Sequence, residues 1–118
     1  MRLNLYVTLF LVAGNNIQLP FGEYDNVVVK TVTTQWYALL DTGPAVKDRT
    51  GKVTVQFYLS FDGSVDKLAI LENTAGTEQG NLSKKAIQNA APFPRWSADM
   101  QRMIGTNSRQ ITFTFYYY

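Results

Sequence analysis

The sequence predicts an α+β domain in which two helices pack on a three- to four-stranded antiparallel sheet, in the order (β)-α-β-β-α-β. Two stretches repeat an apolar residue at helical spacing, and others alternate apolar and polar residues with the period of a strand. Helices on one face of an antiparallel sheet bury every apolar side that these patterns produce. The 118 residues fit one ordinary domain, which buries roughly two-thirds of its unfolded surface.

We interpret residues 1–20 as a separate segment and residues 21–118 as the domain. The apolar run Leu3 to Ala13 is too short to cross a bilayer, which requires roughly 20 residues. Its strand-forming residues favour a first β-strand. The basic start at Arg2 keeps a leader remnant or membrane-proximal segment open as the alternative.

A first helix is predicted from about Glu23 to Asp41. Acidic residues lie in its first turn, where they complement the helix dipole, and Thr42-Gly43-Pro44 ends it. Because many of its residues are β-branched, packing must hold this helix together. Its apolar side consists of Tyr24, Val28, Val32, Trp36 and Leu40.

From Gly51 the period changes to two, which predicts a strand. Asp62-Gly63 supplies residues suited to a type I′ turn, in which both central residues have positive φ. Val65 to Leu71 is then the returning strand. The apolar side of the first strand consists of Val53, Val55, Phe57, Leu59 and Phe61.

A shorter helix is predicted from Leu82 to Ala90, ending before Pro92. Pro92-Phe93-Pro94-Arg95-Trp96 is expected to be extended or turned, because a residue that precedes proline avoids the α region. Alternation then returns from Ile111 to Tyr118 and predicts a last strand.

The composition argues against an enzyme. The chain has neither cysteine nor histidine, so it lacks the best nucleophile, the commonest general base and the commonest metal ligand. Asp62 and Asp66 bracket one loop, but we interpret them as a turn former and a solvated strand residue. We therefore expect no catalytic residues, no metal site and no cofactor.

The last strand is the candidate partner-binding site. A strand at a sheet edge has unpaired backbone N–H and C=O groups that another chain's strand can use. The alternative is that its aromatic residues only cover the sheet within the domain. The candidate residues are Arg109, Gln110, Ile111, Thr112, Phe113, Thr114, Phe115, Tyr116 and Tyr117.

About half of the chain resembles the C-terminal domain of TonB-type energy transducers. The resemblance consists of G-x-V-x-V-x-F from Gly51 to Phe57, Asp62-Gly63-Ser64-Val65, the turn Asn73-Thr74-Ala75-Gly76, the helix that follows and Pro92-Phe93-Pro94. The first helix is more similar to the entry helix of the related TolA C-terminal domain. The Tyr-Pro dipeptide usual before the first core strand of TonB is missing.

The resemblance implies a non-catalytic protein-binding domain in the periplasm, tethered to the inner membrane in any full-length form. It implies that a peptide of an outer-membrane receptor, or another envelope protein, adds a strand to the Arg109 to Tyr117 edge. An inner-membrane proton-channel complex, reached through a missing anchor, is a further implied partner. The sequence leaves a homodimer formed by strand exchange open.

A different class of function is a nucleic-acid-binding αβ module in which Tyr58, Tyr116 and Tyr118 stack on bases. The sequence pI of 8.9 favours it. The eleven Lys and Arg residues are scattered along the chain, which disfavours a phosphate-binding stripe, so nucleic acid is not the favoured partner.

Overall fold

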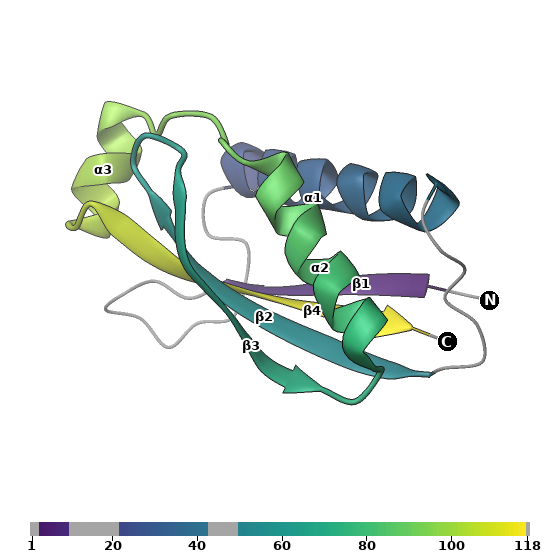
Figure 1. Ribbon diagram of the computed structural model, residues 1–118. Coiled ribbons are helices and arrows are strands. Elements are labelled where there is room, and N and C mark those ends of the chain that lie inside the picture. The colour runs from purple at the N-terminus through teal and green to yellow at the C-terminus, as the bar shows by residue number, and fades with distance from the viewer. Residues whose placement is uncertain (1–2, 10–21, 43–49, 118) are drawn as a thin grey trace.

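The computed structural model describes residues 3–9, 22–42 and 50–117, and in these it has a four-stranded antiparallel sheet with helices on one face (Figure 1). The strand order is β1-β4-β2-β3. The predicted fold class is confirmed. The elements are β1 (Leu3–Leu9), α1 (Gly22–Thr42), β2 (Gly51–Ser60), β3 (Val65–Asn73), α2 (Thr77–Ala90), α3 (Ala98–Ile104) and β4 (Ser108–Tyr117).

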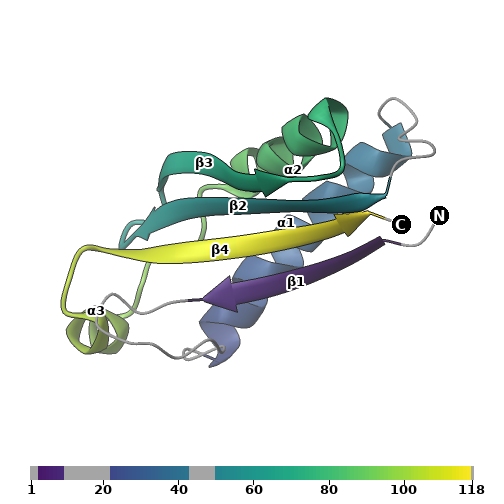
Figure 2. The ribbon, with the colours of Figure 1, turned by 90° about the horizontal axis from the view of Figure 1, so that it is seen from below.

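The core lies between the sheet and the two long helices. Seen from the sheet side, α1 and α2 both lie behind the strands (Figure 2). Every second residue of β2 is buried, as the alternation predicts. The fully buried apolar residues that α1, β2 and β4 contribute are Val28, Val32, Trp36, Val53, Val55, Phe57, Leu59, Ile111, Phe113, Phe115 and Tyr117.

Helix α1 extends one residue beyond the prediction at each end, and its predicted stop at Gly43-Pro44 lies outside the described residues. Two of its threonines satisfy their hydroxyl groups locally. Thr31 Oγ1 donates to the carbonyl of Val27 and Thr33 Oγ1 to that of Val29, both at 2.7 Å. These hydrogen bonds satisfy the hydroxyl groups of two β-branched residues within the helix. Packing against the sheet stabilises the helix as a whole.

The predicted type I′ turn of the β2–β3 hairpin is wrong. Gly63 has a φ of 90°, but Asp62 is not among the described residues with positive φ, which a type I′ turn requires at both central positions. Instead, Gly63 N donates to Ser60 O and Ser60 N donates to Ser64 O, both at 2.9 Å. The connection is a three-residue loop that ends in a glycine with positive φ.

Helix α2 begins at Thr77, five residues before the predicted start at Leu82. The Asn73 side chain organises the turn before it: Asn73 Oδ1 accepts from the amides of Ala75 and Gly76 at 3.0 Å, and its Nδ2 donates to Gly76 O at 2.9 Å. The first turn of α2 carries few apolar residues, so hydrophobic spacing alone did not reveal it.

Helix α3 was missed by the sequence prediction. Ser97 Oγ caps it by accepting from Met100 N at 3.1 Å, and Gly105 ends it with a φ of 78°. A serine before and a glycine after a short amphipathic stretch are the ordinary signals of a helix. At seven residues, α3 is too short for its apolar period to stand out.

The proline-rich segment that was predicted to be extended or turned closes over the hairpin loop. Phe93 N donates to Gly63 O at 2.8 Å, and Trp96 N donates to Phe61 O at 2.9 Å. Tyr24 Oη donates to Pro94 O at 2.7 Å and links the segment to α1. Burial raises the pKa of Tyr24 to about 12. These bonds join the hairpin, the proline-rich segment and α1 at one end of the sheet.

Candidate functional site

The structure brings all nine candidate partner-binding residues together in β4, but β4 is not a sheet edge. It pairs antiparallel with β2 on one side and with β1 on the other. The expectation of a free edge is therefore wrong, because Leu3–Leu9 pairs with residues 111–117 of β4. In the described part of the chain, β1 and β3 form the edges of the sheet.

The side chains of β4 divide between its two faces. On the helix side they are fully buried: Arg109, Ile111, Phe113, Phe115 and Tyr117. On the opposite face Thr112 is also buried, whereas the side chains of Gln110, Thr114 and Tyr116 are partly exposed. The helix-side residues of β4 are thus part of the core.

A hydroxyl network holds the end of β4 against both long helices. Tyr117 Oη accepts from Trp36 Nε1 of α1 at 2.9 Å, lies 2.8 Å from Ser83 Oγ of α2, and donates to Gln79 O at 3.2 Å. Burial raises the pKa of Tyr117. The Trp36 ring meets the rings of Phe115 and Tyr117 edge-on at 5.1 and 5.4 Å. This geometry favours aromatic attraction.

A buried ion pair holds the beginning of β4. Arg109 Nη1 lies 2.8 Å from Asp25 Oδ1, and Arg109 Nη2 lies 3.3 Å from Asp25 Oδ2. Both side chains are fully buried. The sequence suggested that Arg109 binds a partner through its backbone and that Asp25 is a charge in the first helical turn. It did not suggest that the two side chains meet. The ion pair therefore anchors the beginning of β4 to α1, and Tyr117 anchors its end to α1 and α2.

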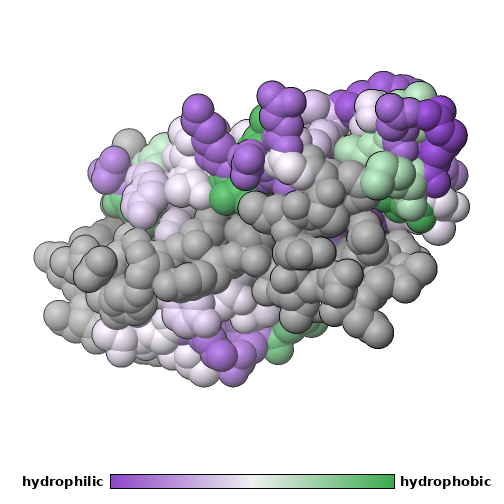
Figure 3. Space-filling model, turned by 180° about the vertical axis from the view of Figure 1, so that it is seen from behind, coloured by the Kyte–Doolittle hydropathy of each residue, from purple (hydrophilic) through white to green (hydrophobic). Residues whose placement is uncertain are grey.

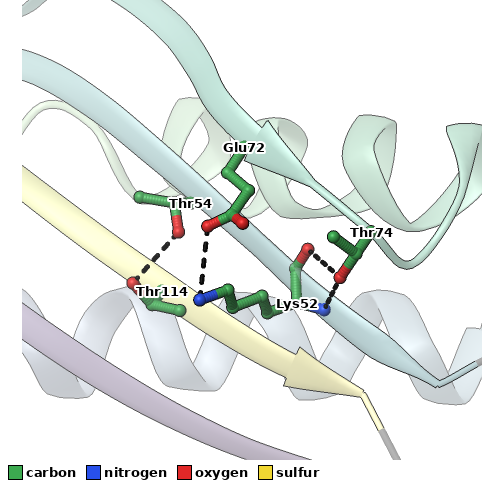
Figure 4. A network of polar contacts seen from close by, with 5 residues as sticks. All are labelled: Lys52, Thr54, Glu72, Thr74 and Thr114. Carbon is green, nitrogen blue, oxygen red and sulfur yellow. Dashed lines mark hydrogen bonds and ion pairs between the residues drawn. The ribbon is translucent and has the colours of Figure 1, made fainter.

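The face of the sheet away from the helices carries polar contacts that cross the strands (Figure 4). Thr54 and Thr114 hydroxyls lie 3.3 Å apart, and Lys52 Nζ lies 3.3 Å from Glu72 Oε1. Lys52 N donates to Thr74 Oγ1 at 2.9 Å. These contacts link β4 to β2, and β2 to β3 and the turn that follows it.

Replacing Thr114 with valine should change the free energy of unfolding by only about 0.2–1 kcal/mol. The substitution removes one cross-strand hydroxyl contact on a partly exposed face and keeps the β-branched shape that a strand favours. Urea denaturation of both proteins measures the difference. A loss above about 2 kcal/mol would mean that this face is more closely packed than the structure indicates.

Asp62 and Asp66, the two carboxylates that bracket the hairpin loop in the sequence, lie in the loop and in β3. Asp62 Oδ1 accepts from Ser64 N at 3.0 Å and from Ser64 Oγ at 2.7 Å, and these hydrogen bonds lower the Asp62 pKa. Asp62 is thus a turn residue, as expected. Within residues 3–9, 22–42 and 50–117, no group of three potential ligands is close enough to hold a metal ion.

The structure describes two of the three tyrosines that would stack on bases in a nucleic-acid-binding module. Tyr58 and Tyr116 are partly buried, and Lys67 Nζ lies 5.5 Å from the centre of the Tyr58 ring. Tyr118 lies outside the described residues. Seen from behind, most of the described surface is hydrophilic, and hydrophobic residues form small separate areas (Figure 3).

Comparison with solved structures identifies the fold. The chain is similar to the NMR structure of the Helicobacter pylori TonB C-terminal domain, with a TM-score of 0.54 and 16% identity over 85% of this chain and 94% of that one. It is also similar to TolAIII bound to a peptide derived from the N-terminus of TolB, with a TM-score of 0.55 and 17% identity over 87% of this chain and 81% of that one. No family model and no curated protein matches the sequence. The chain therefore has a TonB/TolA C-terminal-like fold.

Proposed function

We propose that this chain is a non-catalytic protein-binding domain that receives an extended segment of a partner as an added strand along β4. The observation that supports this proposal is that one side of β4 holds an extended segment, β1, in unbroken register. That side of β4 thus has the straightness and backbone spacing that strand addition requires. The partner-binding residues of the proposal are Arg109 to Tyr117.

The cellular role in this proposal is energy transduction across a cell envelope. The two similar structures support it, because one is a TonB domain and the other is TolAIII in complex with a peptide. The partner is then a segment of an outer-membrane receptor or of another envelope protein, and the domain works in the periplasm. The inner-membrane tether is a further part of the proposal. Among the described residues, no helix is long and apolar enough to cross a membrane.

Strand addition makes a prediction about which peptides bind. Peptides selected against the full chain from a random display library should share an extended, alternating pattern and little sequence, because backbone hydrogen bonds supply most of the recognition. In NMR titrations with the labelled chain, the largest amide shifts should fall on residues 109–117 and on β1. Shifts confined to α1, α2 or α3 would instead indicate a helix surface and contradict the proposal.

A matched pair of modified peptides serves as the control. In an added strand, alternate backbone N–H groups point toward the neighbouring strand and the others point away. N-methylation of every second residue in one phase should abolish binding, and methylation in the other phase should leave it nearly unchanged. Equal binding of both methylated peptides would rule out strand addition.

A further inference from the structure

The pairing between β1 and β4 extends over seven residues without a register shift. A regular ladder of this kind satisfies the backbone N–H and C=O groups on that side of β4. The opposed residues are Leu3 and Tyr117, Asn4 and Tyr116, Leu5 and Phe115, Tyr6 and Thr114, Val7 and Phe113, Thr8 and Thr112, and Leu9 and Ile111.

This side of β4 is suited to a paired strand. The residues of β4 that pair with β1 include Ile111, Thr112 and Phe113, which are consecutive and buried. A backbone polar group left without a partner in buried surroundings costs about as much as a lost hydrogen bond. Removing β1 without a replacement loses the hydrogen bonds of this ladder, whereas exchanging it for another strand conserves them.

The opposite edge of the sheet is poorly suited to strand addition. The pairing of β3 with β2 shifts register twice, between Thr54 and Val55 and between Gln56 and Tyr58. Lys67 of β3 has a φ of 54°. Bulges and charged residues are the features with which natural sheets prevent pairing at an edge. Of the two sides of the described sheet, the β1 side therefore has the regular pairing.

Of the two strands beside β4, β1 is the one whose departure disturbs the domain less. Strand β2 pairs with both β3 and β4 and also lies against α2. Strand β1 makes its principal backbone contacts with β4, and no other described element approaches it comparably. Figure 2 shows β1 at the margin of the sheet, beside β4.

We infer that β1 is an exchangeable internal ligand, which covers the docking side of β4 until the segment of a partner replaces it. This inference rests on the proposed function. It specifies the partner as an extended segment of about seven residues that runs antiparallel to β4. Apolar residues occupy every second position of that segment, in the pattern of Leu3, Leu5, Val7 and Leu9, whose register partners are the buried residues of β4.

A disulfide between β1 and β4 tests the exchange in the full chain. The chain has no cysteine, so the double variant Tyr6→Cys/Thr114→Cys contains a single cysteine pair. These positions are directly opposed, and opposed residues in antiparallel strands have Cα atoms about 4.5–5.5 Å apart, within the range of a disulfide. Oxidation locks β1 in place, and reduction releases it in the same molecule.

The probe is a synthetic peptide of the Leu3–Leu9 sequence with lysines at both ends for solubility. In the reduced variant, the peptide competes with a tethered copy of itself, so half of the molecules should exchange near the effective concentration of the tether, on the order of millimolar. The oxidised variant should show less than about one-tenth of that exchange at the same peptide concentration. Loss of the paired-state amide signals of residues 3–9 in the labelled chain measures the exchange, and each single-cysteine variant controls for the substitutions.

Equal exchange in the oxidised and reduced forms would overturn the inference, as would the absence of exchange in a reduced, folded variant. The library-selected peptides separate this result from the proposed function. If they bind the oxidised and reduced forms equally well, the chain binds peptides, but neither by displacing β1 nor along β4, because both sides of β4 are then paired. If they bind only the reduced form, both proposals gain support.

Discussion

Replacing Gly63 with alanine should destabilise the domain by about 2–5 kcal/mol, a large part of the ~5–15 kcal/mol that a small domain has. A Cβ at this position would lie 1.8 Å from the backbone carbonyl oxygen of Phe93, and Gly63 has a φ of +90°. The backbone conformation costs an alanine roughly 1–2 kcal/mol. Separating the hairpin loop from Phe93 adds the strain of overpacking, about 1–3 kcal/mol. Urea unfolding monitored by tryptophan fluorescence measures the sum.

Gly105→Ala is the matched control. Gly105 has a φ of +78°, but nothing lies within 4 Å of the Cβ that alanine would add. This variant should lose only the backbone contribution, roughly 1–2 kcal/mol. A loss in Gly63→Ala no larger than that in Gly105→Ala would show that the loop and the Phe93 segment separate easily. It would contradict the close docking of this segment on the hairpin.

Gly63 also illustrates which part of the fold local sequence predicts. The alternation on either side of Asp62-Gly63 was enough to place the hairpin and to decide which residues of β2 face the core. The turn type was wrong, because Phe93 N donates to Gly63 O and Trp96 N to Phe61 O from a segment thirty residues further along the chain. Contacts of that separation leave no periodic signal in the hairpin itself.

In the candidate site, too, local sequence predicts the strand but not its contacts with distant parts of the chain. Period-two alternation predicted the last strand, and in the structure Phe113 and Phe115 are among its buried residues. Whether a strand lies at an edge depends on which other strand reaches it, and alternation carries no information about that. The segment Leu3–Leu9 was recognised as a candidate strand, but its place beside β4 follows from register with residues 111–117, more than one hundred positions away.

Charged residues were the hardest to interpret from sequence. Asp25 fits the first turn of a helix, and Arg109 fits a scattered surface charge, so neither residue type nor spacing suggested that the two would be buried together. Charged residues are almost never fully buried without a partner. The pairing is visible only once α1 packs across the sheet, which brings residues 25 and 109 together.

Replacing Arg109 with methionine should cost about 3–5 kcal/mol of unfolding free energy, because it leaves the Asp25 carboxylate buried without its guanidinium partner. Asp25→Leu should cost a similar amount for the converse reason. The double variant Asp25→Leu/Arg109→Met should be less destabilised than the sum of the two, since apolar residues of similar size often replace a buried ion pair at little cost. Urea unfolding of all four proteins completes the double-mutant cycle.

The exposed pair of Arg102 and Asp99 in α3 provides the control for this cycle. It joins the same two residue types, but solvent screens its charges, so Arg102→Met should cost no more than about 1 kcal/mol. The Arg109 variant also reports on the site: because the ion pair anchors the start of β4 to α1, amide exchange should accelerate first at residues 108–111. If Arg109→Met proved as mild as Arg102→Met, the pair would not hold β4 in place, and the rigid template on which strand addition depends would have to come from Tyr117 and its hydroxyl network alone.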